Sequence, residues 1–564
     1  MGRHVNPLFA EYFEKQLELN PLMASSIGDD RYNDRFEVSI SPEWRQRSLA
    51  VTRDFLERAR AIDASKLDGQ ELLSYQVFVY NLERHIGAAK YPAHLLPINQ
   101  FYSTPDYFAQ LGSGSSLHPF RTIKDYEDFL KRVDGFLAWV EQAIVNMNEG
   151  IEKNYRQPKI LVERIVPQLE EHIVEHVTDS LFWKPIDQLP EDFDAADRER
   201  LQAEYRHTIS ERIVPAYAKL RDYMRDTYLP ASRDTHGMWD LPDGDDWYAF
   251  RVDGTTTTEL TPAQIHQVGL DEVKRIHEEM HSVMRDTGFE GTLDEFFEFM
   301  NTDPRFIAET QDELLQSYRD MKSRIEPHLS KLFDVRPSTG YEVRAVEPFR
   351  QKTASGASYI RGTPDGSRRG VFYVNAHNLA AHPKWKIESL SLHEAEPGHH
   401  FQIAIQQERD ELPDFRRFGE YMAFMEGWAL YAENLGEDLG VYTDPYQHFG
   451  KLNAELWRAI RLVVDTGLHY KRWSREDVLA YMHANSTVQE ARAVAEAERY
   501  MAIPSQALAY TIGQLELMKL RGEAERRLGD KFDIREFHNH VLLNGALPLK
   551  LLESNIDRWI EANS

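Results

Sequence analysis

Residues 391–400 read SLHEAEPGHH, and this stretch carries the first indication of both the fold and the chemistry of the chain. A His-Glu pair followed by another histidine is typical of the helical zinc-binding motif HExxH. In that motif the second histidine lies four residues after the first, on the same face of the helix. Here the residue four positions after His393 is Pro397, whose side chain cannot bind a metal. A standard HExxH site is therefore excluded.

An unbroken helix would also keep the later histidines away from His393. His399 lies six residues further on, and at about 100° per residue it falls on the far side of the helix. His400 returns to the same face, but at roughly 1.5 Å per residue it sits about 10 Å along the axis. Two nitrogens that bind one zinc ion each lie about 2.0–2.1 Å from it, so they cannot be that far apart.

The Pro397-Gly398 pair changes this geometry. Proline lacks the N–H that would bond back to the carbonyl of His393, and its ring crowds that carbonyl. Glycine permits backbone angles that are closed to other residues. We therefore expect the helix over 386–406 to be interrupted here, so that the chain loops out and brings His399 or His400 beside His393.

A third ligand is available in EGWALYAE (426–433), within a helix predicted over 416–437. Glu426 and Glu433 share one face of that helix, so Glu426 can bind the metal while Glu433 supports a ligand histidine from behind. Glu394, next to His393, is placed to act as general base toward a water that the metal activates. Two histidines, a glutamate ligand and a glutamate base together indicate a zinc-dependent peptide or ester hydrolase.

Composition narrows the alternatives. The chain has 564 residues and no cysteine, so any metal must be held by His, Asp, Glu or water. The 66 Lys+Arg residues against 92 Asp+Glu give a net charge of −26, which argues against a nucleic-acid or membrane partner. No stretch approaches the roughly 18 apolar residues of a membrane span, and the N-terminus lacks the apolar core of a signal peptide. We expect a cytoplasmic protein.

The pattern of residues predicts a mainly α fold. Amphipathic helical spacing dominates residues 1–335 and resumes at 386. Between them, 341–376 alternates β-branched and aromatic residues with turns, which predicts a small antiparallel β-sheet next to the proposed zinc helix. We expect a mostly helical portion over 1–335 that forms one wall of a cleft and a catalytic portion over 336–564, or one continuous domain containing both. The strand GVFYVN (370–375) could pair with an extended substrate as an edge strand.

Two of these motifs resemble known families. EGWALYAE is similar to the EGFAxYxE helix of the gluzincin aminopeptidases, in which the first glutamate is the third zinc ligand. HEAEPGHHFQ resembles the hallmark of the bacterial domain-of-unknown-function family 885, which is grouped with zincin-type metallopeptidases. Further similarity to that family is spread along the chain, in NPLMASSIGDDRYNDRF (20–36), VPAYAKLR (214–221), YLPASR (228–233), TTELTPAQIHQVGL (257–270), RAIRLVVDTGLH (458–469) and PSQALAYTIGQ (504–514).

The resemblance implies a zincin-like helical metallopeptidase fold with one Zn²⁺ per chain. It implies that His393, His399 and Glu426 bind the zinc and that Glu394 is the catalytic glutamate. His399 is favoured over the alternative ligand His400, because related motifs place a ligand histidine directly after glycine.

Tyr510 and His469 lie in motifs that match the family, and we nominate them as catalytic donors that stabilise the oxyanion. Tyr510 could instead be a core residue with a paired hydroxyl, and His469 a helix histidine with satisfied hydrogen bonds. The expected function is zinc-dependent hydrolysis of short peptides. The alternatives are a metal-dependent hydrolase of non-peptide amides or esters and a non-catalytic binding protein on a zincin scaffold. The expected partner is a peptide or another small molecule, and the sequence leaves the oligomeric state open.

Overall fold

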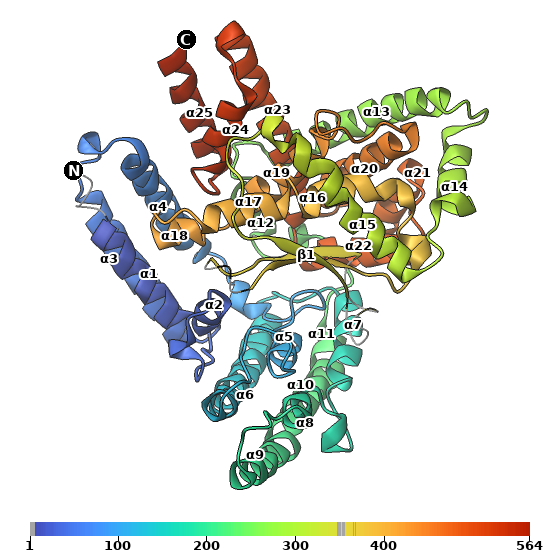
Figure 1. Cartoon of the computed structure of the whole chain (residues 1–564). Coiled ribbons are helices and arrows are strands. Elements are labelled where there is room, and N and C mark those ends of the chain that lie inside the picture. The colour runs from blue at the N-terminus through green and yellow to red at the C-terminus, as the bar shows by residue number, and fades with distance from the viewer. Residues whose placement is uncertain (1–5, 347–350, 352–355, 365, 367) are drawn as a thin grey trace. The chain divides into compact units, whose positions relative to one another are not determined.

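The computed structural model describes residues 6–346, 351, 356–364, 366 and 368–564 (Figure 1). It is mainly helical with one small sheet, as predicted. The chain forms two compact units. The first comprises residues 1–64, 78–247 and 498–503, and the second comprises residues 65–77, 248–497 and 504–564. The predicted division at residue 335 marks the change from the helical pattern to the sheet. That it is a domain boundary stays a prediction, and so does the proposal that residues 1–335 form one wall of a cleft.

The first unit is helical and has its own aromatic core. Phe108 stacks on Phe136 with ring centroids 4.1 Å apart, and the fully buried Arg132 donates to Ser25 and Asn33. Its helices are α1 (Asn6–Leu19), α2 (Pro21–Ser26), α3 (Pro42–Arg60), α5 (Thr104–Leu111), α6 (Ile123–Glu152), α7 (Lys159–Glu170), α8 (Lys184–Asp187), α9 (Ala195–Thr208), α10 (Val214–Tyr223) and α11 (Leu229–Ala231). None of the predicted site residues belongs to this unit.

The second unit contains every predicted site residue. Its helices are α13 (Pro262–Asp286), α14 (Leu293–Thr302), α15 (Gln311–Ile325), α16 (Ile387–Glu394), α17 (His399–Gln407), α18 (Asp414–Arg417), α19 (Met422–Asn434), α20 (Pro445–His469), α21 (Arg475–Asn485), α23 (Ala509–Leu528), α24 (Ile534–Leu542) and α25 (Leu549–Asn563). Three helices have residues in both units: α4 (Gly69–Ala88), α12 (Gly244–Thr256) and α22 (Glu490–Ala502).

Two long helix pairs form the framework of this second unit: α13 packs along α20, and α19 packs along α23. The α19–α23 pair touches backbone to backbone, because a Cβ at Gly427 would lie 2.4 Å from the Cα of Gly513. Glu426 precedes Gly427, and Tyr510 lies about one turn before Gly513 on the same helix. The two glycines therefore bring the glutamate helix against the first turn of α23.

The sheet is mixed, so the prediction of an antiparallel sheet is wrong. Its strands β1 (Tyr341–Ala345), β2 (Ala357–Ile360) and β3 (Gly370–Val374) lie in the order β1-β3-β2. β3 runs parallel to β1 and antiparallel to β2. All five residues of β3 are buried, whereas β1 and β2 each keep exposed positions, so the most apolar strand takes the centre. The prediction that 370–375 serves as an edge strand is therefore also wrong.

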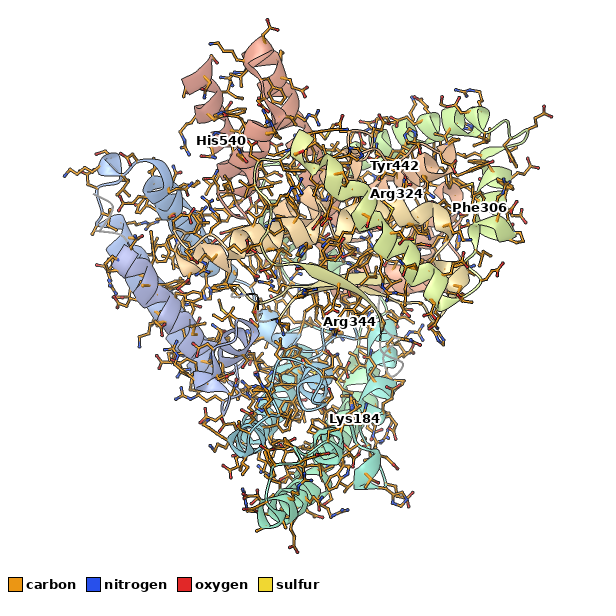
Figure 2. The ribbon with its side chains drawn as sticks, in the orientation of Figure 1. Lys184, Phe306, Arg324, Arg344, Tyr442 and His540 are labelled. Atoms are coloured by element: carbon orange, nitrogen blue, oxygen red, sulfur yellow. The ribbon has the colours of Figure 1, made fainter. Side chains whose placement is uncertain are left out.

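Helix α16 is fixed at its start by buried polar contacts. Glu388 accepts from Arg324 of α15 at 2.7 Å and from the backbone N–H of Tyr442 at 2.6 Å, and Figure 2 labels both partners. Just before the helix, the indole of Trp385 donates to the carbonyl of Met300 at 2.7 Å. These contacts orient the helix that carries His393.

Within the described part of the chain, the helices are all too short or too polar to cross a lipid bilayer.

Candidate metal centre

The predicted helix over 386–406 is interrupted at the predicted place. α16 ends at Glu394 and α17 begins at His399, with Ala395 to Gly398 between them. A Cβ at Gly398 would lie 1.9 Å from the carbonyl oxygen of His393, so no larger residue fits where the chain folds back over the end of α16. The indole of Trp428, on α19, donates to the carbonyl of Pro397 at 2.7 Å and secures the loop. The interruption is confirmed, and it draws α16, α17 and α19 together.

Three side chains converge at this junction. Nε2 of His393 lies 3.6 Å from Oε2 of Glu426, and Nε2 of His399 lies 3.4 Å from the same oxygen. The two imidazole rings are nearly perpendicular, with centroids 4.8 Å apart. On its other side, His393 places Nδ1 2.8 Å from Oε1 of the buried Glu433. One nitrogen of His393 is thus held by Glu433, and the other faces Glu426 and His399.

The electrostatics of the group favour positive charge at its centre. Burial alone would lower the pKa of His393, but the contacts with Glu426 and Glu433 raise it to about 9. Burial likewise opposes ionisation of Glu426, yet the neighbouring His399 and His393 hold the pKa of that carboxyl well below its usual range. The two carboxylates thus stabilise a cation beside the histidines, and a proton and a metal ion would compete for that place.

The residues fit a divalent metal with nitrogen and oxygen ligands. Their ligand atoms all lie within 4.8 Å of one another. Two ligands about 2.0–2.1 Å from a tetrahedral zinc would be about 3.3–3.4 Å apart, close to the spacings of His399 and His393 from Glu426. Oε2 of Glu426 is buried and has no hydrogen-bond partner among the described residues, so a cation would satisfy it. The His399 and Glu426 side chains remain 14% and 20% exposed, which leaves one side open to small molecules.

Glu394 is the last residue of α16, immediately after His393, and is buried. The pKa of the Tyr318 phenol, on α15, is raised by burial and by the charge of the Glu394 carboxylate. The hydroxyl of Tyr318 is buried and has no hydrogen-bond partner among the described residues. Sequence reasoning missed Tyr318, because it occupies a core position of an amphipathic helix and nothing in its local pattern differs from a packing residue.

His400, the alternative ligand, lies apart from this group. Its Nδ1 is 3.0 Å from the hydroxyl of Tyr359 in β2, and its ring packs at 4.7 Å against that of Tyr341 in β1. Burial lowers the pKa of His400 to about 3, so the ring is neutral. The structure therefore gathers His399, rather than His400, with His393.

Tyr510 packs against two arginines of α20, and His469 lies in a different buried group. The guanidinium of Arg461 stands 4.9 Å from the Tyr510 ring and that of Arg458 stands 5.9 Å away, while Gln506 donates to the hydroxyl at 3.4 Å. The charge of Arg458 also lowers the pKa of His393, so this guanidinium lies within electrostatic reach of that imidazole.

His469 is the last residue of α20 and is fully buried. Its ring packs at 5.0 Å against that of Tyr248, whose hydroxyl donates to Asp465 at 2.5 Å. The catalytic roles given to Tyr510 and His469 stay predictions.

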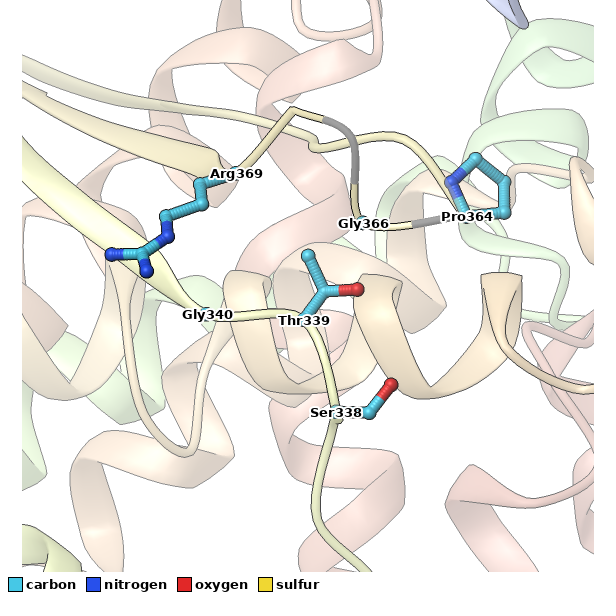
Figure 3. Close-up of a pocket in the computed structure, with 6 residues that line it drawn as sticks. All are labelled: Ser338, Thr339, Gly340, Pro364, Gly366 and Arg369. Carbon is cyan, nitrogen blue, oxygen red and sulfur yellow. The ribbon is translucent and has the colours of Figure 1, made fainter.

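A polar cavity of about 340 Å³ lies elsewhere in this unit (Figure 3). It is lined by residues that precede β1 and by the β2–β3 connection, namely Ser338, Thr339, Gly340, Pro364, Gly366 and Arg369. Glu408 accepts from the backbone N–H groups of Ser338 and Thr339 beside it. None of the predicted site residues lines this cavity.

Two solved structures share the architecture. One is described as a "putative lipoprotein from Colwellia psychrerythraea" and is 30% identical, with a TM-score of 0.92 over 100% of this chain and 99% of the other. The second is described as a "putative lipoprotein of unknown function from Shewanella oneidensis". It is 18% identical, with a TM-score of 0.74 over 97% of this chain and 98% of the other, and this likeness shows the fold alone.

The model of a protein family described as "Bacterial protein of unknown function (DUF885)" matches residues 21–556. Among curated proteins, none matches the chain.

Proposed function

The chain belongs to the DUF885 family, and from the geometry of its His/Glu group we propose that it is a zinc-dependent metallohydrolase that cleaves short peptides. The observation that carries the proposal is the convergence of the His393 and His399 Nε2 atoms on one oxygen of Glu426. Glu433 behind His393 supports it further, because metal-binding histidines commonly donate their other N–H to a carboxylate. That the fold is zincin-like is part of this proposal.

A zinc ion held by His393, His399 and Glu426 would supply a Lewis acid that polarises a carbonyl and lowers the pKa of water. Glu433 keeps the Nδ1 proton of His393 in place, so that Nε2 presents its lone pair toward the centre. Glu394 takes a proton from the attacking water and returns it to the leaving amine. Tyr510 donates a hydrogen bond to the carbonyl oxygen as negative charge develops there.

Two measurements test the proposal. Purified protein should contain about one zinc ion per chain, and a chelator should abolish hydrolysis of a peptide library. The Glu394→Gln variant should keep its metal and should leave the same library uncut. The metal site would be refuted if the purified protein held no tightly bound divalent metal and if chelators did not change its activity. Activity on esters or non-peptide amides with peptides left intact would assign the site to the other hydrolase class.

The expected partner remains a peptide or another small molecule, and the expected location remains the cytoplasm. Both are predictions, and the two solved relatives described as lipoproteins make the location worth testing by cell fractionation.

A further inference from the structure

Lys386 is a cation in the described second unit whose ammonium meets no carboxylate. It directly precedes α16, seven residues before His393, so the two residues share a side of the helix about 10 Å apart along its axis. Its Nζ lies 3.5 Å from the carbonyl of Ala381 and 4.9 Å from the ring centre of Trp385. Burial, together with the charges of Arg492 and Arg458, lowers the pKa of Lys386 to about 7.

Arg458 is a second such cation, on α20, which packs against both α16 and the turn that contains Lys386. Its Nη1 donates to the carbonyl of Ala454 in its own helix at 3.2 Å. Its Nε is buried without a hydrogen-bond partner among the described residues. The charge of Arg458 lowers the pKa of both Lys386 and His393, so this guanidinium lies within electrostatic reach of both.

Two other cations on the same segments have anionic partners. Lys384 pairs with Glu313 at 2.7 Å, and Arg461 pairs with Glu496 at 3.0 Å. Among the residues that the structure describes, no carboxylate lies within ion-pair distance of Lys386 or Arg458. A buried charge without a counter-ion is costly, and a bound anion removes that cost. Both side chains are only partly buried, so a ligand can reach them.

We propose that Lys386 and Arg458 bind the free α-carboxylate of the substrate, which makes the chain a carboxypeptidase-type enzyme for short peptides. This inference rests on the proposed peptide hydrolysis at His393, His399 and Glu426. An extended chain covers at most about 3.3–3.6 Å per residue, so the spacing of about 10 Å along α16 accommodates one to three residues beyond the cleaved bond. Arginine suits the role, because its planar fork matches a carboxylate.

The reaction needs water alone as co-reactant. The C–N bond of one peptide unit breaks and a C–O bond to the water oxygen forms. One water proton passes through Glu394 to the leaving nitrogen, and the other leaves when the new carboxyl group ionises and protonates the freed amine. The products are a shortened peptide with a new carboxylate and a released C-terminal fragment of one to three residues.

The test compares two tetra-alanine peptides with blocked amino ends, one ending in a free carboxylate and one in an amide. The wild-type protein should cleave the acid with a kcat/KM at least ten times that for the amide, and mass spectrometry should find a released fragment of one to three residues. Lys386→Met and Arg458→Met should each lower kcat/KM for the acid about tenfold or more and bring the ratio of acid to amide kcat/KM close to one. The kcat/KM of Arg458→Lys for the acid should lie between the values of the methionine variants and that of the wild type.

Lys384→Met is the matched control, because it removes a lysine two residues away that already has a partner. Its acid-to-amide ratio should equal that of the wild type. Calorimetry on Glu394→Gln gives a readout without turnover, in which the acid should bind at least ten times more tightly than the amide. Adding Lys386→Met to Glu394→Gln should abolish that difference, and Lys386→Gln replaces it if the methionine variant does not fold.

Equal cleavage of acid and amide by the wild type would overturn the carboxylate site and leave the peptidase proposal standing. If the zinc-loaded protein cuts neither peptide nor the library, the peptidase proposal fails. The calorimetric difference between acid and amide then decides the carboxylate site by itself, and equal binding overturns it.

Discussion

Oε1 of Glu433 lies 2.8 Å from Nδ1 of His393, and this contact determines which face of the imidazole is left for Glu426 and His399. Both glutamates come from α19, seven residues apart, so one helix supplies the carboxylate at the centre and the carboxylate behind it. The orientation of His393 therefore depends on how α19 packs against α16. Its consequences can be measured separately from turnover.

Replacing Glu433 should weaken metal binding without removing a ligand. Glu433→Gln removes the charge that orients His393, and loss of such a partner costs about 10–100-fold in metal affinity. Competition with a chromophoric chelator measures the affinity. Glu437→Gln, at an exposed position four residues further on, is the control and should bind zinc as the wild type does. If both variants bound zinc with the same affinity, Glu433 would have no role in the metal site.

Gly398→Ala should destabilise the fold and disperse the metal ligands. The added Cβ would meet the carbonyl oxygens of His393 and Leu392 at 1.9 and 2.3 Å, so the loop must move. Overpacking of this kind costs about 1–3 kcal/mol. Thermal melting and zinc content measure the two effects. Gly522→Ala, where a Cβ meets nothing within 4 Å on the helix α23, should be neutral or slightly stabilising.

Glu394→Gln should lower kcat about 10²–10⁴-fold while zinc stays bound. The amide keeps the shape of the side chain and removes its ability to take a proton. Steady-state kinetics and metal analysis on the same preparation provide the comparison. A variant with wild-type kcat would show that Glu394 is not the base.

The preference for a free carboxylate should fall as the pH rises through 7. The pKa of Lys386 is lowered to about 7, so its ammonium is charged below that pH and neutral above it. The groups that face it are Arg458 of α20, Arg492 of α22 and His382, whose pKa burial lowers to about 4, so none of them supplies a compensating negative charge. The ratio of acid to amide kcat/KM between pH 6 and 8 measures the effect, and Lys386→Arg should flatten the profile because arginine stays charged.

Asp465 should make the protein less stable as the pH rises from about 4 to 7. Burial raises its pKa to about 7, against the opposing hydrogen bonds from Tyr248 and the Ser505 N–H and the charge of Arg251. The folded state then holds the proton more tightly than the unfolded chain, whose aspartate has a pKa near 3.9, and this stabilisation is lost as the proton leaves. Urea unfolding at pH 5 and 8 should show the difference between wild type and Asp465→Asn moving in favour of the variant at pH 8. A constant difference would contradict the shift.

The interruption at Pro397-Gly398 could be predicted because it is local. A missing N–H and a missing Cβ act within one turn of helix, whatever packs around them. The alignment of Glu426 with Glu433 could also be predicted, since it follows from the helical repeat alone. The sheet could not. Its order depends on which strand is most completely buried, and β3, which is buried along its whole length, takes the central place.

The sequence by itself thus determined the mainly helical fold, the break between α16 and α17, and the residue types that a metal could use. The tertiary structure decided which histidine faces His393. His399 of α17 faces Glu426. His400 instead packs against Tyr341 of β1 and lies within hydrogen-bond distance of the hydroxyl of Tyr359 in β2. The tertiary structure also packed α20, which carries Arg458, against α16 and the turn that contains Lys386, a contact that no local pattern encodes. The physical reason is the same in each case: backbone rules act over a few residues, whereas burial and charge compensation act between segments that only packing brings together.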